Sequence, residues 1–376
     1  MTSHDAGHDA GDEFVEEPRR PPFLRLVDKL VIALFFAPIL LAALPLGANR
    51  DWAWAPIAVA IGLVAVLVAL GFGAGRGFEV GERERRPLLV LIACFGVVVA
   101  FVLLQGSSIA PASGSAWLYA AALRILGSAH AAVPDIAIDA ARNGLLKCIA
   151  CGLIFGMARA ICQDRRHARA LLVVLVVSAA LVMIYALIMQ VTTHGCYVGG
   201  YLKKQGAYDP RGQCLWSGTF ANSNSFACYV GMGIVAAIAL ILSSRRRQRA
   251  GFDGRDVQSF ESVLSGPRVV LVAVIFFLLG GLLLSASRAG FAASVAGALA
   301  LGLLLMRGQW RERQDLVRWF VAGAVIVLVV GLVAGGAMLA KAVRADESGN
   351  RLVIWMTSLH AIGLSPWLGW GLGSFA

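Results

Sequence analysis

The sequence predicts an all-α membrane protein whose helices cross the bilayer about nine times. Of its 376 residues, 59% are hydrophobic and only 15% are charged, whereas soluble domains have roughly 45–50% apolar and about 25% charged residues. The apolar residues gather in runs of about 20, which is the length that a helix needs to cross a bilayer. This composition excludes a soluble domain with a single core. It also excludes a disordered chain, which has few apolar residues and many charges.

Nine apolar runs separated by basic clusters are the expected spans. Each is expected to be helical, because a backbone amide or carbonyl in lipid has no water to pair with. The run from 170 to 190 has no charged residue, whereas the run from 144 to 160 carries Lys147 near its start, where a long side chain can reach the membrane surface. The expected spans are 29–47, 54–74, 88–105, 144–160, 170–190, 224–242, 269–286, 290–306 and 319–340.

The distribution of basic residues orients these spans. The N-terminal tail and the loops on its side of the membrane contain 22 of the 33 Lys and Arg residues. Because cytoplasmic loops are enriched in Lys and Arg, the N-terminus is predicted to be cytoplasmic. The net charge of +11 is then mainly a topology signal. Its dispersion over many loops argues against a surface that binds nucleic acid.

Three regions follow from this arrangement. Residues 1–26 are expected to be a disordered cytoplasmic tail, residues 27–340 a transmembrane helical domain, and residues 341–376 the start of a large loop on the outer side. The tail is rich in His and Asp, which can bind a metal weakly, but a solvated tail is the preferred interpretation. No metal site is therefore predicted.

The outer loop from about 191 to 222 contains two cysteines and two adjacent lysines. Cys196 and Cys214 are 18 residues apart. In an oxidising compartment they either close a disulfide or remain two free thiols. Lys203 and Lys204 lie between them and are candidate substrate-binding residues.

This loop ends in a polar, turn-rich stretch, GTFANSN, at residues 218–224, which opens the next span. An Asn or Ser side chain at this place can cap the helix by accepting hydrogen bonds from its free amides. The same amides can instead hold an anion. Asn222 and Asn224 are therefore candidate substrate-binding residues, with capping alone as the simpler alternative.

A second polar stretch, SASRAG at residues 285–290, joins two apolar runs with almost no loop. On the predicted topology it is an outer hairpin, and Arg288 is its only charge. An ionisable residue at the membrane boundary is a functional candidate. The planar fork of donors in Arg suits phosphate. The alternative is an anchor to lipid headgroups.

The last outer segment carries Arg351 and an apolar pattern with helical spacing. Asn350 is expected to cap a short amphipathic helix, whose apolar face would pack or contact lipid. The glycine-rich turn after Pro366 is not a dinucleotide fingerprint, because no strand precedes it and no helix follows it.

Three motifs, in this order, resemble the O-antigen ligase and polymerase superfamily of bacterial envelope enzymes. They are GTFANSN, SASRAG and the stretch NRLVIWMTSLHAIGLSPWLGWGLGSF that begins at Asn350. The resemblance covers residues from about 170 to 376, and the earlier spans agree by topology. It implies a multi-pass glycosyltransferase of the bacterial inner membrane that acts on the periplasmic face without a metal or nucleotide cofactor.

The implied reaction moves a glycan from undecaprenyl pyrophosphate to an acceptor, which is lipid A core, a growing polysaccharide or a protein hydroxyl. The resemblance assigns Arg288 and Arg351 as catalytic residues that clamp the pyrophosphate. It also implies a histidine base further along the outer loop. Since the sequence stops at Ala376, the protein is expected to be C-terminally truncated and, as it stands, an inactive fragment.

A polysaccharide or lipid transporter is the alternative function. It would need charged residues along a pathway inside the spans, whereas the expected spans are almost free of charge.

Overall fold

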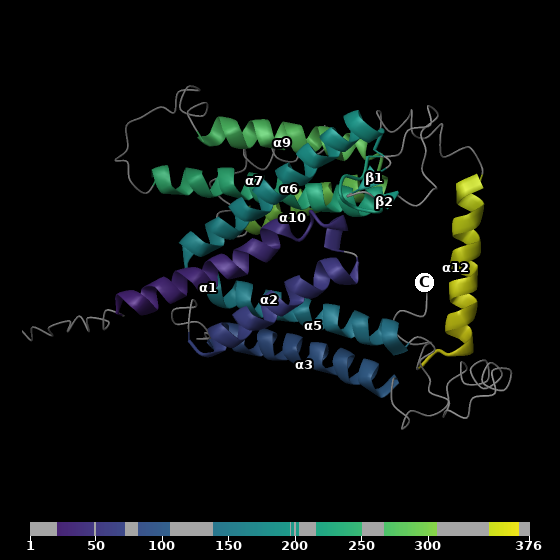
Figure 1. The fold of residues 1–376 in the computed structure, drawn as a ribbon, viewed down its shortest axis with the longest axis horizontal. Helices are drawn as coiled ribbons and strands as arrows, with labels where there is room; N and C mark the ends of the chain where they lie inside the picture. Colours follow the sequence, from purple (N-terminus) through teal and green to yellow (C-terminus); the bar gives the residue numbers. More distant parts are fainter. Residues whose placement is uncertain are drawn as a thin grey trace, which may run out of the picture.

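The computed structural model describes residues 21–48, 50–71, 82–105, 138–195, 197–198, 201–202, 216–249, 267–306 and 346–367. These residues form a bundle of helices (Figure 1). In this part of the chain, five helices are long and apolar enough to cross a membrane, and three further apolar helices are shorter. The all-α, polytopic class predicted from composition is confirmed.

Eight of the nine expected spans coincide with helices, and the ninth, 319–340, lies outside the described residues. The helices are α1 (Pro22–Leu41), α2 (Asp51–Ala69), α3 (Glu82–Gln105), α5 (Ile138–Ile161), α6 (Arg165–Thr193), α7 (Ser223–Arg249), α9 (Pro267–Leu284), α10 (Arg288–Met306) and α12 (Asp346–Leu364), with a short 3-10 turn, η1 (Leu46–Ala48). Strands β1 (Tyr197–Val198) and β2 (Tyr201–Leu202) pair antiparallel after α6.

The described helices all begin earlier than the sequence analysis expected, and the starts of α1, α5 and α12 have local explanations or consequences. Helix α1 starts at Pro22, inside the expected tail, because Pro suits the first helical turn, where its missing N–H has no role. Helix α5 starts at Ile138, six residues before the expected span, with Asp139 in the favourable N-terminal turn. Helix α12 starts at Asp346, so the expected cap at Asn350 is wrong and that residue lies inside the helix.

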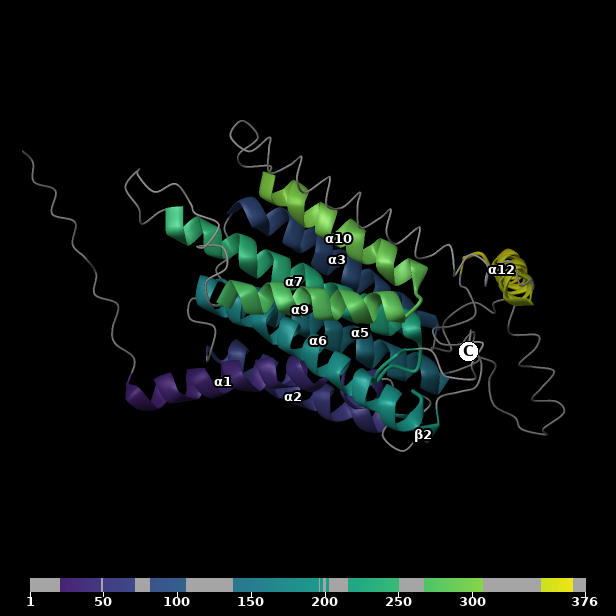
Figure 2. The ribbon, with the colours of Figure 1, turned by 90° about the horizontal axis from the view of Figure 1, so that it is seen from above.

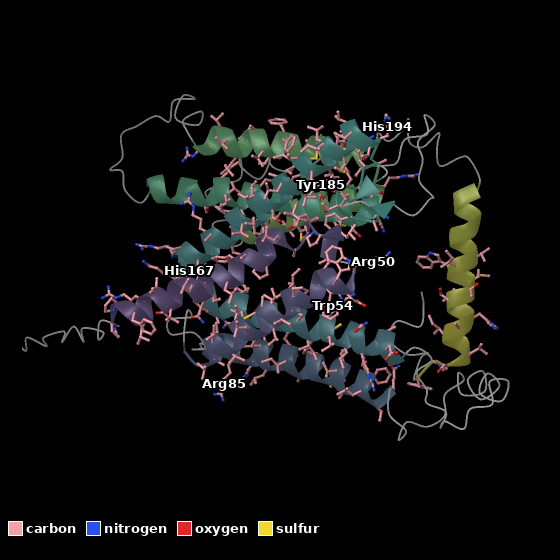
Figure 3. All side chains as sticks on the ribbon, viewed as in Figure 1. Arg50, Trp54, Arg85, His167, Tyr185 and His194 are labelled. Atoms are coloured by element: carbon pink, nitrogen blue, oxygen red, sulfur yellow. The ribbon has the colours of Figure 1, made fainter. Side chains whose placement is uncertain are left out.

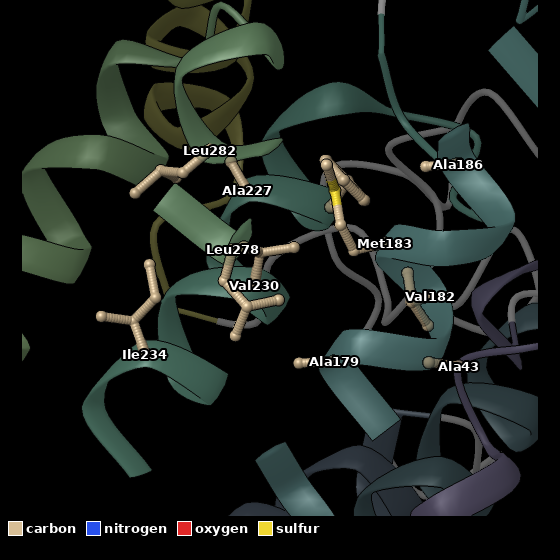
Figure 4. Packing of buried hydrophobic residues seen from close by; sticks show 11 residues of the cluster. Ala43, Ala179, Val182, Met183, Ala186, Ala227, Val230, Ile234, Leu278 and Leu282 are labelled. Atoms are coloured by element: carbon tan, nitrogen blue, oxygen red, sulfur yellow. The ribbon is translucent and has the colours of Figure 1, made fainter. Parts of the chain in front are cut away.

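The bundle contains two packed groups of helices. In the first group, α6, α7 and α9 share one buried cluster that includes Met183, Phe226 and Leu278, shown from close by in Figure 4, and α10 packs against α7. In the second group, α1, α2 and α5 share another cluster that includes Phe35, Ile61 and Ile161. Figures 1 and 2 show α3 beside α5 at the edge of this second group.

Side-chain hydroxyls tie the end of α1 to the first group. The fully buried Ser178 of α6 donates to the carbonyl of Leu40 at 2.6 Å, and the Tyr229 hydroxyl of α7 lies 2.6 Å from the same Ser178 oxygen. Thr219 donates to the carbonyl of Ala43, also at 2.6 Å. Leu40 lies in the last turn of α1, whose carbonyls have no partner within the helix, so the Ser178 hydroxyl supplies one. Ala43 follows the helix, and its carbonyl accepts from the Gly47 amide as well as from Thr219.

The described charged residues sort to the two ends of the bundle. Figure 3 shows Arg85 and His167 at one end, and Arg50 and His194 at the other. The α9–α10 hairpin and the start of α7 lie at the end of Arg50 (Figure 1). The grouping agrees with the predicted topology, in which the end with Arg50 is the outer one. Which end faces the cytoplasm stays a prediction.

Cysteine labelling tests this orientation. In a protein whose native cysteines are replaced by alanine, Arg50→Cys should react with a membrane-impermeant maleimide added to intact spheroplasts. Arg166→Cys, which is equally exposed at the start of α6, should react only after the membrane is opened, because cytoplasmic loops are the basic ones. The reverse labelling pattern would overturn the topology.

Candidate functional site

Three breaks between helices meet at the predicted outer end of the bundle. They are the turn 42–48 after α1, the segment 216–222 before α7, and the hairpin 285–287 between α9 and α10. Thr219 bonds the first to the second through Ala43. The ring of Phe220 also fills the place where a side chain on Gly47 would lie. A hydrogen bond from Ser287 to Asn224 joins the third break to the first turn of α7, directly after the second break.

Asn222 caps the N-terminus of α7. Its Oδ1 accepts from the backbone amide of Asn224 at 2.6 Å and from that of Ser225 at 3.4 Å. Two of the amides that an α-helix leaves unpaired at its start are thereby satisfied. The capping role predicted for this stretch is confirmed for Asn222. Its exposed side-chain amide nitrogen has no hydrogen-bond acceptor among the residues that the structure describes.

Ser287 caps α10 and at the same time links it to α7. Its Oγ accepts from the Gly290 amide at 3.0 Å and donates to the Asn224 Oδ1 at 2.7 Å. Ser287 is only 5% exposed. The preceding Ser285 closes the end of α9 by donating to the Leu282 carbonyl at 2.6 Å. The N-termini of α7 and α10 are therefore fixed side by side.

Left-handed backbone conformations are concentrated at this end. All four described non-glycine residues with positive φ lie here: Leu46 (51°), Ala48 (53°), His194 (52°) and Ala286 (56°). Such conformations are unfavourable for residues with a side chain and persist only where the surroundings enforce them. Their clustering marks the outer end as the part of the fold that departs most from regular helix.

Arg288 is the first residue of α10 and projects from this junction as an exposed side chain. No described carboxylate lies within ion-pair distance of its guanidinium. A helix N-terminus carries partial positive charge, which disfavours a cation there and favours an anion. With two adjoining helix N-termini and a guanidinium, the junction has the character of an anion-binding site.

The structure places the other predicted site residues as follows. Arg351 lies in α12, which runs across the outer end of the bundle in Figure 1 and is seen end-on in Figure 2. Asn222 and Asn224 lie at the junction with Arg288. Lys203, Lys204, Cys196 and Cys214 lie outside the described residues. In the part of the chain that the structure describes, no cluster of His, Cys, Asp or Glu could hold a metal ion.

Comparison with known protein families found one similarity, which covers the C-terminal part of the chain. Residues 272–376 match the family described as O-antigen ligase. This part of the chain is similar to the O-antigen ligase family. The match contains Arg288 and Arg351, and the predicted resemblance to the O-antigen ligase and polymerase superfamily is confirmed. No curated protein and no solved structure matches the chain.

The matched region begins inside α9, so it contains only one side of the junction. The α10 side, with Ser287 and Arg288, lies in the region that matches the O-antigen ligase family, whereas Asn224 and the segment 216–222 precede that region. Sequence analysis identified both motifs but missed the hydrogen bond between them. Polar residues between apolar runs indicate that hydrogen bonds form there, since buried polar groups in lipid need partners. They do not indicate which groups pair with each other.

Replacing Ser287 with alanine tests the link between α7 and α10. The variant loses the cap of α10 and the bond to Asn224, so its free energy of unfolding should fall by about 1–2 kcal/mol. Thermal unfolding in detergent measures the change. Ser294→Ala is the matched control, because the Ser294 hydroxyl bonds only the Gly290 carbonyl of its own helix. Equal melting temperatures for the two variants would contradict the proposed link.

Proposed function

We propose that this protein is a glycosyltransferase of the O-antigen ligase and polymerase type. It moves a glycan from undecaprenyl pyrophosphate to an acceptor, such as lipid A core or a growing polysaccharide, on the periplasmic face of the bacterial inner membrane. The observation that carries the proposal is the position of Arg288, inside the region that matches the O-antigen ligase family and at two adjoining helix N-termini. That arrangement suits the phosphate groups of such a donor.

The junction offers the electrostatic part of this reaction. Glycosyl transfer breaks the bond between the sugar carbon and the pyrophosphate oxygen, while the acceptor hydroxyl oxygen forms the new bond and loses its proton to a base. Negative charge therefore grows on the departing lipid pyrophosphate. Arg288 can bind two phosphate oxygens at once, and the fixed helix ends stabilise the same charge without rearranging.

Other residues would also bind the substrate. The exposed side-chain amide of Asn222 can donate to a phosphate or sugar oxygen at the same junction, and the side-chain amide of Asn224 can donate there as well. Arg351, on the helix that runs across the outer end, would supply a second guanidinium for the pyrophosphate. Lys203 and Lys204 would contact the substrate from the loop that precedes α7.

Substitution of the two arginines tests this function. Arg288→Ala and Arg351→Ala, expressed in a strain whose own copy of the gene is deleted, should each reduce polymer transfer by about 100-fold or more, as is typical when one donor to a developing oxyanion is lost. Arg288→Lys should retain part of the transfer, because lysine keeps the positive charge but lacks the planar pair of donors that binds two phosphate oxygens. Gel profiles of the surface polysaccharide measure the product.

Arg268→Ala is the matched control, since Arg268 lies at the opposite end of α9. It should leave transfer unchanged. All variants must reach normal levels in the membrane, as measured by immunoblot. Wild-type polysaccharide profiles in both Arg288→Ala and Arg351→Ala would remove the pyrophosphate clamp and would favour a role without glycosyl transfer, such as transport.

A further inference from the structure

A second cluster of charged and aromatic residues lies at the outer end of the other helix group. The ammonium of Lys147 in α5 stands 5.2 Å from the centre of the Trp54 ring in α2. The Trp54 indole nitrogen donates to the Asp51 carboxylate at 2.9 Å. Lys147 has no carboxylate or hydrogen-bond acceptor among the described residues.

The position of Lys147 along α5 places its ammonium close to the membrane boundary. Lys147 follows the first residue of α5, Ile138, by nine positions, or about 13 Å of helix rise. Helical side chains lean towards the N-terminus of their helix, and the N-terminus of α5 lies at the outer end. Trp54 lies in the first turn of α2 at that end, and Trp is enriched at such boundaries.

Lipid can approach this cluster directly. Leu146 beside Lys147 and Val59 and Leu63 below Trp54 are each more than half exposed. In a membrane-spanning bundle, such aliphatic surfaces contact acyl chains. A molecule that reaches Lys147 can therefore lay its chains along α2 and α5 and its headgroup at the level of Trp54.

The chemistry of the cluster favours a phosphate as that headgroup. An ammonium has three donors, and an aromatic face attracts its charge without offering lone pairs in return. Lys147 is half-buried, so leaving these donors unpaired is costly. Arg50, an exposed cation directly before α2, adds a second positive charge one turn from Trp54, and Asp51 is already engaged by the indole.

We propose that Lys147, Trp54 and Arg50 form a binding site for the phosphate of a membrane lipid, at the outer end of α2 and α5. The site belongs to the helix group built around Phe35 and Ile61, and not to the group that carries Arg288. Its phosphate comes either from an anionic phospholipid or from a phosphorylated lipid acceptor. Only the second source rests on the proposed glycosyl transfer.

Native mass spectrometry of the detergent-purified protein tests this site. Phosphatidylglycerol should bind the wild type more tightly than phosphatidylcholine, and Lys147→Ala should weaken phosphatidylglycerol binding by about tenfold, the scale of one charge-assisted hydrogen bond. Lys147→Arg should retain it. Arg142→Ala is the matched control, because Arg142 is an exposed cation on the same helix that pairs with Asp139 instead. Unchanged binding in Lys147→Ala, or an equal loss in Arg142→Ala, would overturn the proposal.

Two further measurements complete the experiment. Thermal unfolding without lipid verifies that Lys147→Ala is folded, and Lys147→Gln, which keeps a polar side chain, replaces it in the assay if it is not. Competition with diphosphorylated lipid A distinguishes the sources: displacement of phosphatidylglycerol identifies a lipid acceptor, and retention identifies a phospholipid. Binding is read without any transfer reaction, so failure of this site and failure of the proposed enzyme activity give separate results.

Discussion

The pairing of backbone groups where helices end is the constraint on which this structure depends. Lipid offers no hydrogen bonds, so carbonyls and amides at helix ends that lie away from water need partners from the protein. Ser178 and Thr219 supply partners to the carbonyls of Leu40 and Ala43. Asn222 and Ser287 supply partners to the amides of α7 and α10. These bonds join segments that are distant in sequence, and they assemble the outer end.

The same pairing gives the outer end its chemistry. When the cap of α10 donates to the first turn of α7, two positive helix ends are held together. Arg288 adds a full charge at the place where the dipoles already disfavour one. A cation there becomes favourable once an anion is bound, which is the arrangement expected of an enzyme that must stabilise a departing pyrophosphate. The described non-glycine residues with left-handed backbone also lie at this end.

The sequence was sufficient to predict the helices and some of their caps. It was not sufficient to predict which residues of different helices contact each other at the helix ends. Long apolar runs predicted eight helices, and the local pattern around Asn222 predicted its cap, because both depend on neighbouring residues alone. The bond between Ser287 and Asn224 spans 63 positions and depends on how closely α7 and α10 pack, which Gly290 permits by leaving room for Ala227. Lys147 was predicted to reach the membrane surface, but its partner Trp54 lies on a helix that no local pattern connects to α5.

Binding of a lipid diphosphate tests the central claim most directly. Farnesyl diphosphate and farnesyl monophosphate carry the same short isoprenoid chain and differ in the phosphate groups that the junction would recognise. Isothermal titration of the purified protein should show tighter binding of the diphosphate, and Arg288→Ala should weaken that binding by about tenfold or more while leaving the monophosphate less affected. Equal binding of the two lipids by the wild type, or an unchanged affinity of Arg288→Ala for the diphosphate, would contradict the account.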